Sequence, residues 1–535
     1  MTYRVLVTDG VDPEGVALLL AESALTVDEL PTLPREELLR RIGDYDAIVG
    51  RSATHISAEL LERAPRLRVV GRAGVGVDNI ALDVATSLGV AIINAPAGNT
   101  VAVAELFFGS VIGLLRQIPQ ATRTMREGRW DRAQFMGREL RDKTLGIVGL
   151  GRIGGEVAMR AHAFGMQVVG FDPYVADERF TALRVRRAPS LDALIAETNI
   201  LTLHVPLTEE TRGMIGKREL SHLPAHSVVV NLARGGIVDE TALAAALASH
   251  ELRGAVLDVF ATEPMASDHP LRTAPNIVLT PHLGASTVEA QRNVARDVCI
   301  AVRDALLHQD LSRSINVAAG TGGWADLQPA MLVARRAAAV ARAVLADQGM
   351  RAVRRVSLRL GPGLAHGAGA LLAAAAAGVL EGVIESERLN LINARSLAEA
   401  RGLELSVSES ADLGHPRAME VSLAGGMQQL AVAGMAPLGS TPRLTRIGSF
   451  HVEVNPRHTL LILTNHDVPG VIGRVGTLLG ERNVNIAEYH QARLAQGGDA
   501  LAAISVDGTV DDSTRRALLD LPDVLTASIV HFRAD

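Results

Sequence analysis

The sequence predicts an α/β chain of four domains, with parallel sheets first and a compact α+β unit last. Three observations support this prediction. Short β-branched runs alternate with helical patterns over the first 300 residues, a glycine-rich turn joins a strand to a helix near residue 150, and the last eighty residues follow the order βαββαβ. At about 150 residues per domain, the length of 535 residues also suggests three or four domains.

Composition excludes several classes of protein. A hydrophobic fraction of 48% and a charged fraction of 21% indicate a globular chain, and a net charge of −6 gives no case for a nucleic-acid or membrane partner. The single cysteine, Cys299, excludes an intramolecular disulfide and a cysteine-cluster metal site, and we predict no metal. Met1–Asp9 opens directly into a strand pattern, and the weakly apolar stretches Gly361–Leu380 and Val421–Pro442 do not resemble membrane spans. We therefore expect a cytoplasmic protein.

The first hundred residues alternate predicted strands with predicted helices, which indicates a parallel sheet covered by helices. We expect strands at Arg4–Thr8, Ala47–Val49, Arg68–Gly71 and Val90–Ile93, and helices at Glu14–Ser23 and Arg35–Arg41. A long apolar helix is predicted next, over Val101–Arg116.

A second α/β unit begins at Lys143 and continues to about Leu283. Ser286-Thr287-Val288-Glu289 then forms a capping-box pattern, which predicts the start of another long helix. After Asn316 the sequence pattern changes, and Gly320-Thr321-Gly322-Gly323 is typical of a linker. Residues 325–450 mix Ala-rich helices with short strands, predicted at Val353–Leu360, Leu403–Ser408, Ala418–Leu423 and Gln429–Ala433.

The last eighty residues give the clearest pattern of secondary structure. Strands are predicted at His458–Thr464, Ile486–Arg493, Ala500–Val506 and Val524–His531, and helices at Gly470–Arg482 and Ser513–Leu521. Their order along the chain is that of a ferredoxin-like fold.

The strongest local motif is Thr144-Leu-Gly-Ile-Val-Gly149-Leu-Gly151-Arg152-Ile-Gly154, which follows an apolar strand and opens a helix. Gly149 permits a tight turn, Gly151 lets the backbone approach a pyrophosphate, and Gly154 allows the helix to pack closely on the strand. The N-terminus of the helix adds free N–H groups and the positive end of its dipole. The motif therefore predicts a dinucleotide site.

The residues after the next strand favour NAD over NADP. Asp172 ends the strand Gln167–Phe171, where its carboxylate would accept hydrogen bonds from the adenosine ribose and repel a 2′-phosphate. The following residues, Pro173 and Tyr174, carry no compensating cation.

Three polar residues, Arg234, Glu263 and His282, each come after an apolar strand. The strands are predicted at Ser227–Leu232, Gly254–Phe260 and Ile277–Leu279. Because ligands bind at the carboxyl ends of parallel strands, all three side chains could project from one edge. A histidine suits removal of a hydroxyl proton, a carboxylate fixes its tautomer, and an arginine holds a substrate carboxylate. Taken alone, His282 could equally be a structural cap and Glu263 could lie in a solvated turn. The three residues in combination favour a catalytic role.

The strings GLGRIG, NLARGGIVDE, DVFATEP and PHLGAST together resemble the D-isomer-specific 2-hydroxyacid dehydrogenase family, over about residues 3–315. The resemblance implies a flavodoxin-like substrate domain of residues 1–98 and 286–316, with a Rossmann-type NAD-binding domain of residues 99–285 inserted in it. It assigns catalysis to Arg234, Glu263 and His282. The NAD contacts that it implies are Val75, Gly149, Gly151, Arg152, Ile153, Gly154, Asp172, Pro173, Val205, Pro206, Leu232, Ala233, Arg234, Asp258, His282 and Gly284.

Four further strings resemble the members of this family that oxidise a phosphorylated acid: Gly50–Thr54, Gly71–Asn79, Gly98–Thr100 and Trp130–Gly137. This likeness implies oxidation of 3-phospho-D-glycerate to 3-phosphohydroxypyruvate, the first step of phosphorylated L-serine synthesis. It implies that the phosphate and carboxylate of the substrate are bound by Arg51, Ser52, Arg72 and Asn99. It also implies that Gly74 lines the nicotinamide site and that Arg132 reaches the site from a second subunit. Without the resemblance, Arg51 and Arg132 are ordinary surface arginines.

The C-terminal unit, residues 456–535, resembles an ACT regulatory domain through Asn465-His-Asp467-Val-Pro-Gly470 and Val484-Asn485-Ile486. The resemblance implies L-serine as effector, with Asn465 and Asp467 at its amine and hydroxyl groups and Asn485 bridging two paired domains. Residues 317–455 match an intervening α+β regulatory domain by position and size only. Paired ACT domains and Arg132 in trans imply at least a dimer, and the family expectation is a homotetramer.

Two alternatives remain open at this stage. Another D-2-hydroxyacid dehydrogenase, acting on hydroxypyruvate, glyoxylate, 2-oxoglutarate or lactate, would not need Arg51 and Arg132. A non-catalytic NAD-sensing binding protein would keep the same three residues, Arg234, Glu263 and His282.

Overall fold

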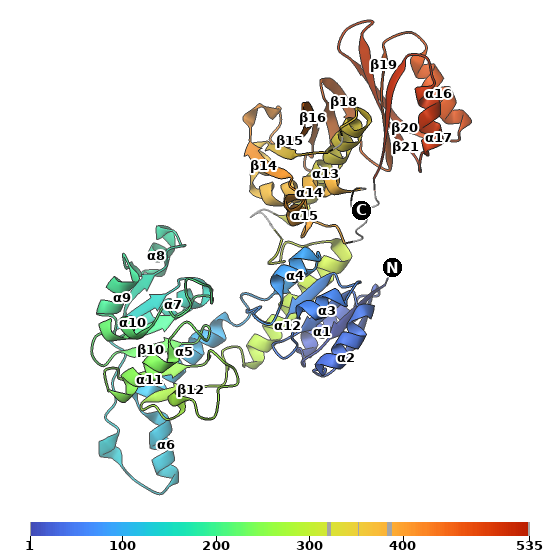
Figure 1. Cartoon of the computed structure of the whole chain (residues 1–535). Coiled ribbons are helices and arrows are strands. Elements are labelled where there is room, and N and C mark those ends of the chain that lie inside the picture. The colour runs from blue at the N-terminus through green and yellow to red at the C-terminus, as the bar shows by residue number, and fades with distance from the viewer. Residues whose placement is uncertain (1, 318–322, 351, 382, 384–387, 533–535) are drawn as a thin grey trace.

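The structure is a computed structural model that describes residues 2–317, 323–350, 352–381, 383 and 388–532 (Figure 1). These residues form two parallel sheets, one mixed sheet and one antiparallel sheet, so the predicted fold class is confirmed. Except for Gly323, the predicted linker at 320–323 lies outside the described residues. The four predicted domain ranges remain our proposal.

The N-terminal lobe contains a five-stranded parallel sheet in the order β2-β1-β3-β4-β5. The strands are β1 (Tyr3–Val7), β2 (Leu25–Glu29), β3 (Ala47–Gly50), β4 (Val69–Arg72) and β5 (Ala91–Asn94). The helices are α1 (Pro13–Leu20), α2 (Arg35–Arg41), α3 (Ala58–Glu62), α4 (Leu82–Ser87) and, from later in the chain, α12 (Val288–His308). The 3-10 turn η1 covers Ile42–Asp44. Strand β2 was not predicted, because only Leu25 in it is buried.

Helix α12 returns to cover this first sheet. Val298 and Val302 pack on β4 at Gly71, where a Cβ would be 2.7 Å from both side chains. The predicted capping box was wrong by one residue. The helix begins at Val288, Thr287 caps it by accepting a hydrogen bond from the Ala290 N–H (3.1 Å), and Glu289 falls one position too early for the reciprocal bond.

The second lobe contains a seven-stranded parallel sheet in the order β12-β11-β10-β9-β6-β7-β8. The strands are β6 (Thr144–Val148), β7 (Gln167–Phe171), β8 (Arg186–Arg187), β9 (Ile200–Leu203), β10 (Val228–Asn231), β11 (Gly254–Leu257) and β12 (Ile277–Leu279). The helices are α5 (Thr100–Leu115), α6 (Ile118–Arg126), α7 (Arg152–Ala163), α8 (Asp177–Leu183), α9 (Leu191–Glu197), α10 (Lys217–His222) and α11 (Glu240–Ala248). The 3-10 turns are η2 (Arg132–Gln134) and η3 (Pro270–Arg272).

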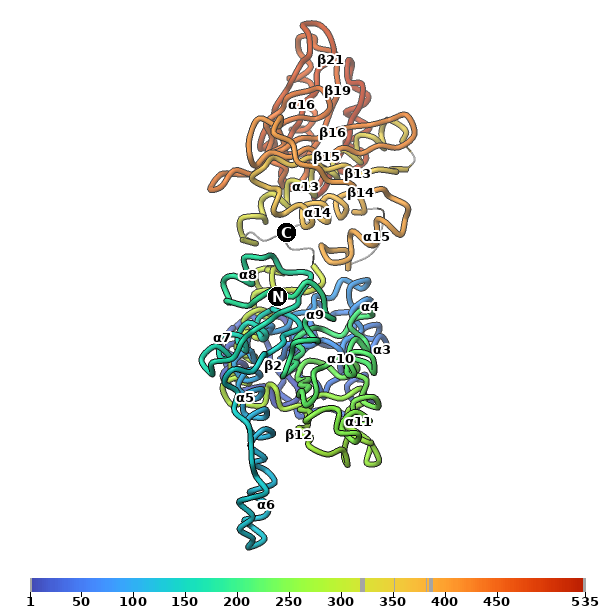
Figure 2. The backbone as a smooth tube through the Cα atoms, turned by 90° about the vertical axis from the view of Figure 1, so that its left-hand side faces the viewer, coloured from blue at the N-terminus to red at the C-terminus, as the bar shows by residue number. Residues whose placement is uncertain are grey.

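Helix α6 projects from this second lobe as an arm, which is plain in Figures 1 and 2. Large apolar side chains on the arm and the segment after it are exposed, notably Trp130 (79%) and Met136 (85%). An exposed apolar arm on a globular lobe is typical of a surface that another chain covers.

The remaining residues form a mixed six-stranded sheet and an antiparallel four-stranded sheet, in the orders β14-β13-β15-β16-β17-β18 and β20-β21-β19-β22. The second order is that of a ferredoxin-like fold. The strands are β13 (Arg355–Leu360), β14 (Glu404–Glu409), β15 (Ala418–Gly425), β16 (Gln428–Met435), β17 (Arg443–Ile447), β18 (Phe450–Val454), β19 (Thr459–His466), β20 (Ile486–Arg493), β21 (Asp499–Val506) and β22 (Val524–His531). The helices are α13 (Trp324–Asp347), α14 (Ala368–Leu380), α15 (Ala394–Ala400), α16 (Val471–Glu481) and α17 (Asp512–Leu519), with 3-10 turns η4 (Pro362–Gly367) and η5 (Ala411–Leu413).

These last two sheets share one hydrophobic core, which the sequence did not predict. Leu460, Ile462 and Val530 of the four-stranded sheet belong to the same buried cluster as Val333 of α13 and Val452 of β18. The buried Arg336 of α13 reinforces the junction by hydrogen bonding to the Pro456 carbonyl, and its guanidinium lies 4.9 Å from the centre of the Phe532 ring. The two units, for which the resemblance above implies a regulatory role, therefore pack as one body, which we call the regulatory body.

The stretch Pro362–Leu380 is long and apolar enough to cross a membrane, but 72% of its 18-residue window is buried inside the protein. The joined helices Thr100–Leu115 and Ile118–Arg126 pass the same length and composition test, with a bend of 61° between them. The burial of Pro362–Leu380 is typical of a core helix rather than of a span.

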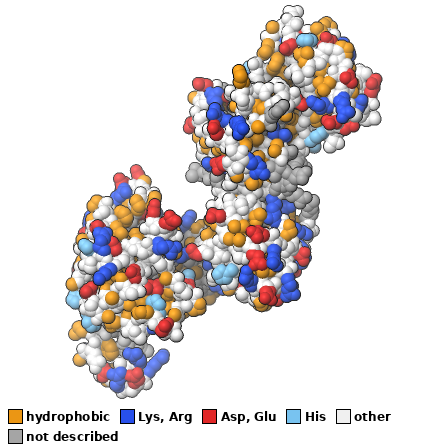
Figure 3. Space-filling model, viewed as in Figure 1, with side chains coloured by type: hydrophobic (Ala, Val, Ile, Leu, Met, Phe, Trp, Pro, Cys, Tyr) orange, Lys and Arg blue, Asp and Glu red, His pale blue; other side chains and the backbone are white. Residues whose placement is uncertain are grey.

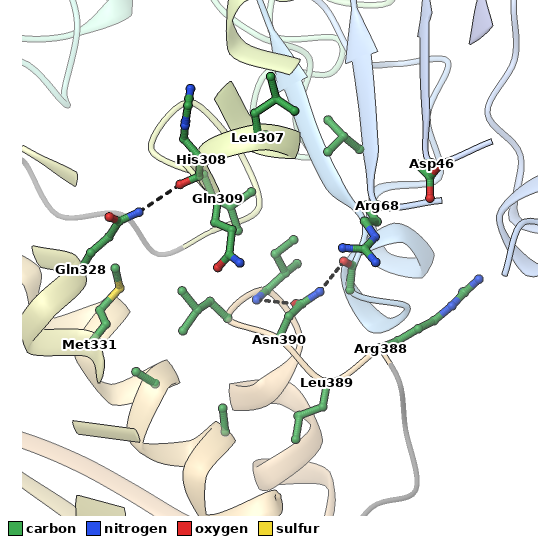
Figure 4. Close-up of a pocket in the computed structure, with 18 of the residues that line it drawn as sticks. Asp46, Arg68, Leu307, His308, Gln309, Gln328, Met331, Arg388, Leu389 and Asn390 are labelled. Atoms are coloured by element: carbon green, nitrogen blue, oxygen red, sulfur yellow. Dashed lines mark hydrogen bonds between the residues drawn. The ribbon is translucent and has the colours of Figure 1, made fainter. Parts of the chain in front are cut away.

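The regulatory body meets the N-terminal lobe across a cavity of about 1500 Å³ (Figure 4). Arg388 donates hydrogen bonds to the carbonyls of Ala64 and Pro65, and Asn390 donates to the Gly89 carbonyl (2.7 Å). These carbonyls precede β4 and β5, so the contact is made at the amino ends of those two strands.

The close packing of α14 on α13 gives a stability prediction. A Cβ at Gly378 of α14 would be 1.9 Å from the Arg335 carbonyl oxygen of α13. Gly378→Ala should therefore destabilise the regulatory body by about 1–3 kcal/mol through overpacking. Calorimetric unfolding measures this change as a lower transition temperature.

Gly476→Ala is the matched control, because a Cβ in the middle of α16 would meet open space. It should instead stabilise its helix, by up to about 1 kcal/mol. Equal effects of the two substitutions would contradict the packing described for α13 and α14.

Candidate active site

The carboxyl ends of three adjacent strands bring Arg234, Glu263 and His282 to one edge of the seven-stranded sheet. β10 pairs with β11 and β11 with β12, all in parallel register. The three residues follow the ends of these strands in turn, as the sequence predicted. The edge at which a dinucleotide fold binds its ligands therefore carries all three side chains.

His282 and Glu263 form a hydrogen-bonded pair with a separation of 2.7 Å between Nδ1 and Oε2. Because a carboxylate accepts, the Nδ1 atom carries the proton and Nε2 is left as the basic nitrogen. The other carboxylate oxygen of Glu263 accepts a bond from the Phe260 N–H (3.0 Å), which fixes the orientation of the carboxylate. The pair can therefore accept a proton at Nε2 and stabilise the resulting charge.

The turn that carries His282 is held by the buried carboxylate of Asp258, which is 1% exposed. It accepts hydrogen bonds from the Thr280 hydroxyl (2.6 Å), the Leu283 N–H (2.7 Å) and the Gly284 N–H (2.8 Å). His282 itself has a left-handed backbone, with φ of 55°. Asp258, expected as an NAD contact, thus also fixes the backbone that aims the imidazole.

Arg234 connects the second lobe to the N-terminal lobe. Asn231 holds its turn, donating from its amide to the Arg234 carbonyl (2.7 Å) and accepting from the Ala233 N–H (3.1 Å). The Arg234 guanidinium then donates through Nε to a carboxylate oxygen of Asp78 (3.0 Å). The space-filling view shows the two lobes as separate masses joined at a waist, with blue and red side chains interspersed on this face (Figure 3).

Arg72 lies at the end of β4, beside Arg234 and Arg51. Its burial, followed by repulsion from Arg234 and from Arg51, lowers the pKa of Arg72 to about 10, and Asp78 and Asp9 oppose that shift. Its Nε is buried without a hydrogen-bond partner within the described residues. Three guanidinium groups therefore converge on one place, which is suited to an anion with several negative charges.

Two glycines make room for these arginines. A Cβ at Gly74 would be 1.2 Å from an Nη atom of Arg72, and a Cβ at Gly76 would be 2.1 Å from an Nη atom of Arg234. The loop after β4 therefore wraps two guanidinium groups, and Val75 between the glycines is held by a bond from Asn94 to its carbonyl (2.5 Å).

The loop that carries Arg51 and Ser52 is fixed by residues that the sequence did not single out. The Asp9 carboxylate accepts bonds from the Arg51 N–H (2.8 Å) and the Thr54 N–H (2.9 Å). The Asn79 amide donates to the carbonyls of Arg51 (3.1 Å) and Thr54 (2.7 Å). The side chain of Ser52 is exposed, beside a half-buried Arg51.

Asn99 adds a further polar group to the junction of the lobes. It precedes α5, and its Oδ1 atom is buried without a hydrogen-bond partner within the described part of the chain, as is Oγ1 of Thr100. Buried polar atoms are normally paired, so these orphan atoms together with Arg72 Nε indicate that a ligand completes the site.

The glycine-rich turn has the geometry that a dinucleotide requires. Gly149 has φ of 90°, and a Cβ there would be 2.5 Å from the His204 carbonyl oxygen. A Cβ at Gly154 would be 2.0 Å from the Gly149 carbonyl oxygen, whereas at Gly151 it would meet nothing within 4 Å. The open space lies at the N-terminus of α7, where Arg152 and Ile153 begin the helix and where free N–H groups suit a pyrophosphate.

Asp172 and Arg179 support this turn. The Asp172 carboxylate accepts bonds from the N–H groups of Leu150 and Tyr174 (both 2.9 Å). Arg179, which sequence reasoning missed, donates to the carbonyls of Leu150 (3.1 Å) and Gly151 (2.9 Å). The other expected NAD contacts also follow strand ends: Pro173 after β7, Val205 and Pro206 after β9, and Leu232 and Ala233 after β10.

Within one chain, the structure does not bring every expected site residue together. Arg132 is exposed in η2, on the segment that follows the projecting α6. Asn465 lies buried beside the amino end of β21, while Asn485 bonds to Asp507 just past its carboxyl end (2.6 Å). Asp467 is bonded to Arg493 (3.0 Å) and to the Gly497 N–H (3.3 Å), bonds that lower its pKa. Among the described residues, no group of three or more His, Cys, Asp and Glu side chains could hold a metal ion.

Comparison with known proteins identifies the family. Residues 108–284 match the model of the D-isomer specific 2-hydroxyacid dehydrogenase NAD-binding domain, and residues 458–523 match the ACT domain. The D-3-phosphoglycerate dehydrogenases of Methanocaldococcus jannaschii and Bacillus subtilis are each 35% identical over 531 residues, covering 99% of this chain and 99% of theirs. The chain belongs to the D-3-phosphoglycerate dehydrogenase family.

The chain is also similar to solved dehydrogenases that match little more than half of it. The D-lactate dehydrogenase of Aquifex aeolicus, solved with NAD and lactic acid, is 28% identical with a TM-score of 0.52, and the match covers 58% of this chain and 97% of that one. The chain is an NAD-dependent oxidoreductase that acts on a small 2-hydroxy acid, and its C-terminal ACT domain indicates binding of a second small molecule.

The open space at Gly151 gives a direct test of the NAD site. Gly151→Ala should weaken NAD binding, because the added methyl group takes the place of the pyrophosphate oxygens, while φ of −66° suits alanine and the fold is untouched. Calorimetric titration with NAD and thermal unfolding of the free protein measure the two effects. Unchanged NAD affinity, or a loss of stability in the free protein, would contradict this geometry.

The lowered pKa of Arg72 predicts how anion binding depends on pH. Arg72 is charged below a pKa of about 10 and loses its charge as the pH rises through that value. Affinity for inorganic phosphate, which stays a dianion, should therefore fall between about pH 9 and 11. In Arg72→Met the affinity should be low throughout, without that fall. A wild-type affinity that stays level through this range would show that Arg72 does not bind the anion.

Proposed function

We propose that the chain oxidises 3-phospho-D-glycerate to 3-phosphohydroxypyruvate with NAD, as its relatives' names state for them. The observations that support this best are the two arginines, Arg234 and Arg51, whose charges act on the buried Arg72, and the His282–Glu263 pair at the same sheet edge as Arg234. A substrate with a carboxylate at one end and a phosphate at the other presents three negative charges, which these three guanidinium groups match. NAD, when bound, accepts the hydride from C2.

In the proposed mechanism, His282 takes the C2 hydroxyl proton at Nε2. Glu263 at Nδ1 stabilises the imidazolium that forms, and its own bond to the Phe260 N–H keeps it in place. Arg234 holds the carboxylate and polarises the C2 oxygen. The same residues run the reaction in reverse, with His282 returning the proton.

In this proposal the N-terminal lobe binds the phosphate end of the substrate. Arg51 and Arg72 would bind its oxygens, with Ser52 and Asn99 completing the shell and Gly74 leaving space for the Arg72 side chain. Arg132 would complete the site from a neighbouring subunit, because it lies on an exposed arm of its own chain. We therefore propose a homo-oligomer, a dimer or a tetramer.

We propose L-serine as the effector of the ACT domain. Asn465 and Asp467 lie at one end of β21 and Asn485 at the other, so a site that uses all three needs two ACT domains related by a two-fold axis. An effector that reports on the end product suits an enzyme that acts first in a biosynthetic sequence in the cytoplasm, where we place this chain.

An NAD-reduction assay tests the proposed function. The enzyme should reduce NAD with 3-phospho-D-glycerate at a much higher kcat/KM than with D-glycerate or D-lactate, and added L-serine should lower the rate. A preference for an unphosphorylated acid would support a different 2-hydroxyacid dehydrogenase. Tight NAD binding without turnover of any of these acids would support an NAD sensor.

His282→Asn is the matched variant for the mechanism. It should lower kcat by about 10²-fold or more, because the general base is lost, with little change in the affinity for NAD. Turnover close to that of the wild type would rule out His282 as the base.

A further inference from the structure

The ion pair between Asp78 and Arg234 stands between the two catalytic lobes. Its atoms are 3.0 Å apart, and among the described residues it is the one ion pair that joins these lobes. Asp78 comes from the loop after β4 and Arg234 from the turn after β10. The side chain of Asp78 is 68% exposed, so solvent reaches the pair.

The pair occupies the part of Arg234 that a substrate needs. Arg234 donates through Nε to Asp78 and through one Nη atom to the Ala233 carbonyl (2.7 Å). A carboxylate binds a guanidinium side-on through two parallel N–H bonds, and the remaining side consists of Nε and the other Nη. That second Nη lies over Gly76, within reach of any carboxylate that replaces Asp78.

We propose that Asp78 is an internal competitor for the substrate carboxylate: it keeps Arg234 in place when no substrate is bound and is displaced when a substrate binds. The proposal rests on the proposed role of Arg234 as the carboxylate anchor. Asp78 has the same charge and the same two-oxygen geometry as the group it stands in for. It also offsets part of the repulsion among the three arginines, which otherwise favours capture of any small anion.

The consequence is a selective site. Every anion that binds Arg234 must break the internal pair, so simple carboxylates are held weakly. An acid with a second anionic group gains further binding energy at Arg51 and Arg72. That gain offsets the cost of breaking the Asp78–Arg234 pair, so the acid still binds.

The test compares Asp78→Asn with the wild type in the binding of oxalate, a planar dicarboxylate without phosphate, to the complex with NADH. Calorimetric titration in a chloride-free buffer should show oxalate bound about two- to fivefold more tightly by the variant, the range expected for a largely exposed ion pair. The affinity for inorganic phosphate, which would bind at Arg51 and Arg72, should increase less than the affinity for oxalate. In turnover, KM for 3-phospho-D-glycerate should fall without a rise in kcat.

Asp83→Asn is the matched control, an exposed acid on α4 of the same lobe with no ion pair among the described residues. It should leave oxalate binding unchanged. Asp78→Glu keeps the competing charge and should behave more like the wild type than Asp78→Asn does, which guards against a variant that simply misfolds. Weaker or unchanged oxalate binding by a folded Asp78→Asn would overturn the proposal.

The binding measurement separates this proposal from the proposed function. It needs no turnover, so tighter oxalate binding by Asp78→Asn supports the competitor role even if 3-phospho-D-glycerate is not oxidised. Conversely, efficient oxidation of 3-phospho-D-glycerate with no effect of Asp78→Asn on oxalate would leave the proposed function standing and remove the competitor.

Discussion

The burial of Arg72 among like-charged arginines is the constraint on which the substrate edge of this protein depends. Arg51, Arg72 and Arg234 converge from two lobes, and Arg72 is buried enough for its pKa to fall to about 10. Like charges at short range destabilise the fold unless something compensates. Asp78 and Asp9 supply the compensating charge, and glycines in the loop after β4 supply the space. The resulting arrangement is suited to a multiply charged acid.

The sequence predicted much of this site because parallel sheets follow simple rules. Arg234, Glu263 and His282 each follow an apolar run, and adjacent parallel strands end at one edge, so their placement at that edge could be foreseen. Asp78 and Asp9 could not be foreseen in the same way. Asp78 pairs with a residue 156 positions away, and Asp9 holds a loop more than forty positions away. No local pattern encodes contacts of that range.

The same reasoning explains which elements of the fold were missed. Strand β2 is an edge strand with one buried residue, and its sequence LTVDE lacks a clear apolar run. Strands β17 and β18 are only partly buried. Their buried residues are Leu444, Ile447, Val452 and Val454, and the positions between these are mostly polar or charged. The shared core of the two regulatory sheets depends on one face of an antiparallel sheet, and period-two alternation shows that such a face is apolar without showing what covers it.

The regulatory body approaches the catalytic half from the side opposite the substrate. Arg388 and Asn390 bind carbonyls that precede β4 and β5, whereas Arg72 and Asn94 end those strands at the substrate edge. The contact with the regulatory body and the substrate edge therefore lie at opposite ends of β4 and β5. A crystal structure of the complex with NADH and 3-phospho-D-glycerate tests the central claim most directly. The account predicts phosphate oxygens within hydrogen-bond distance of Arg51 and Arg72, the carboxylate on Arg234 in place of Asp78, and the C2 oxygen at His282 Nε2. A phosphate bound away from Arg51 and Arg72, with Arg234 still paired to Asp78, would contradict it.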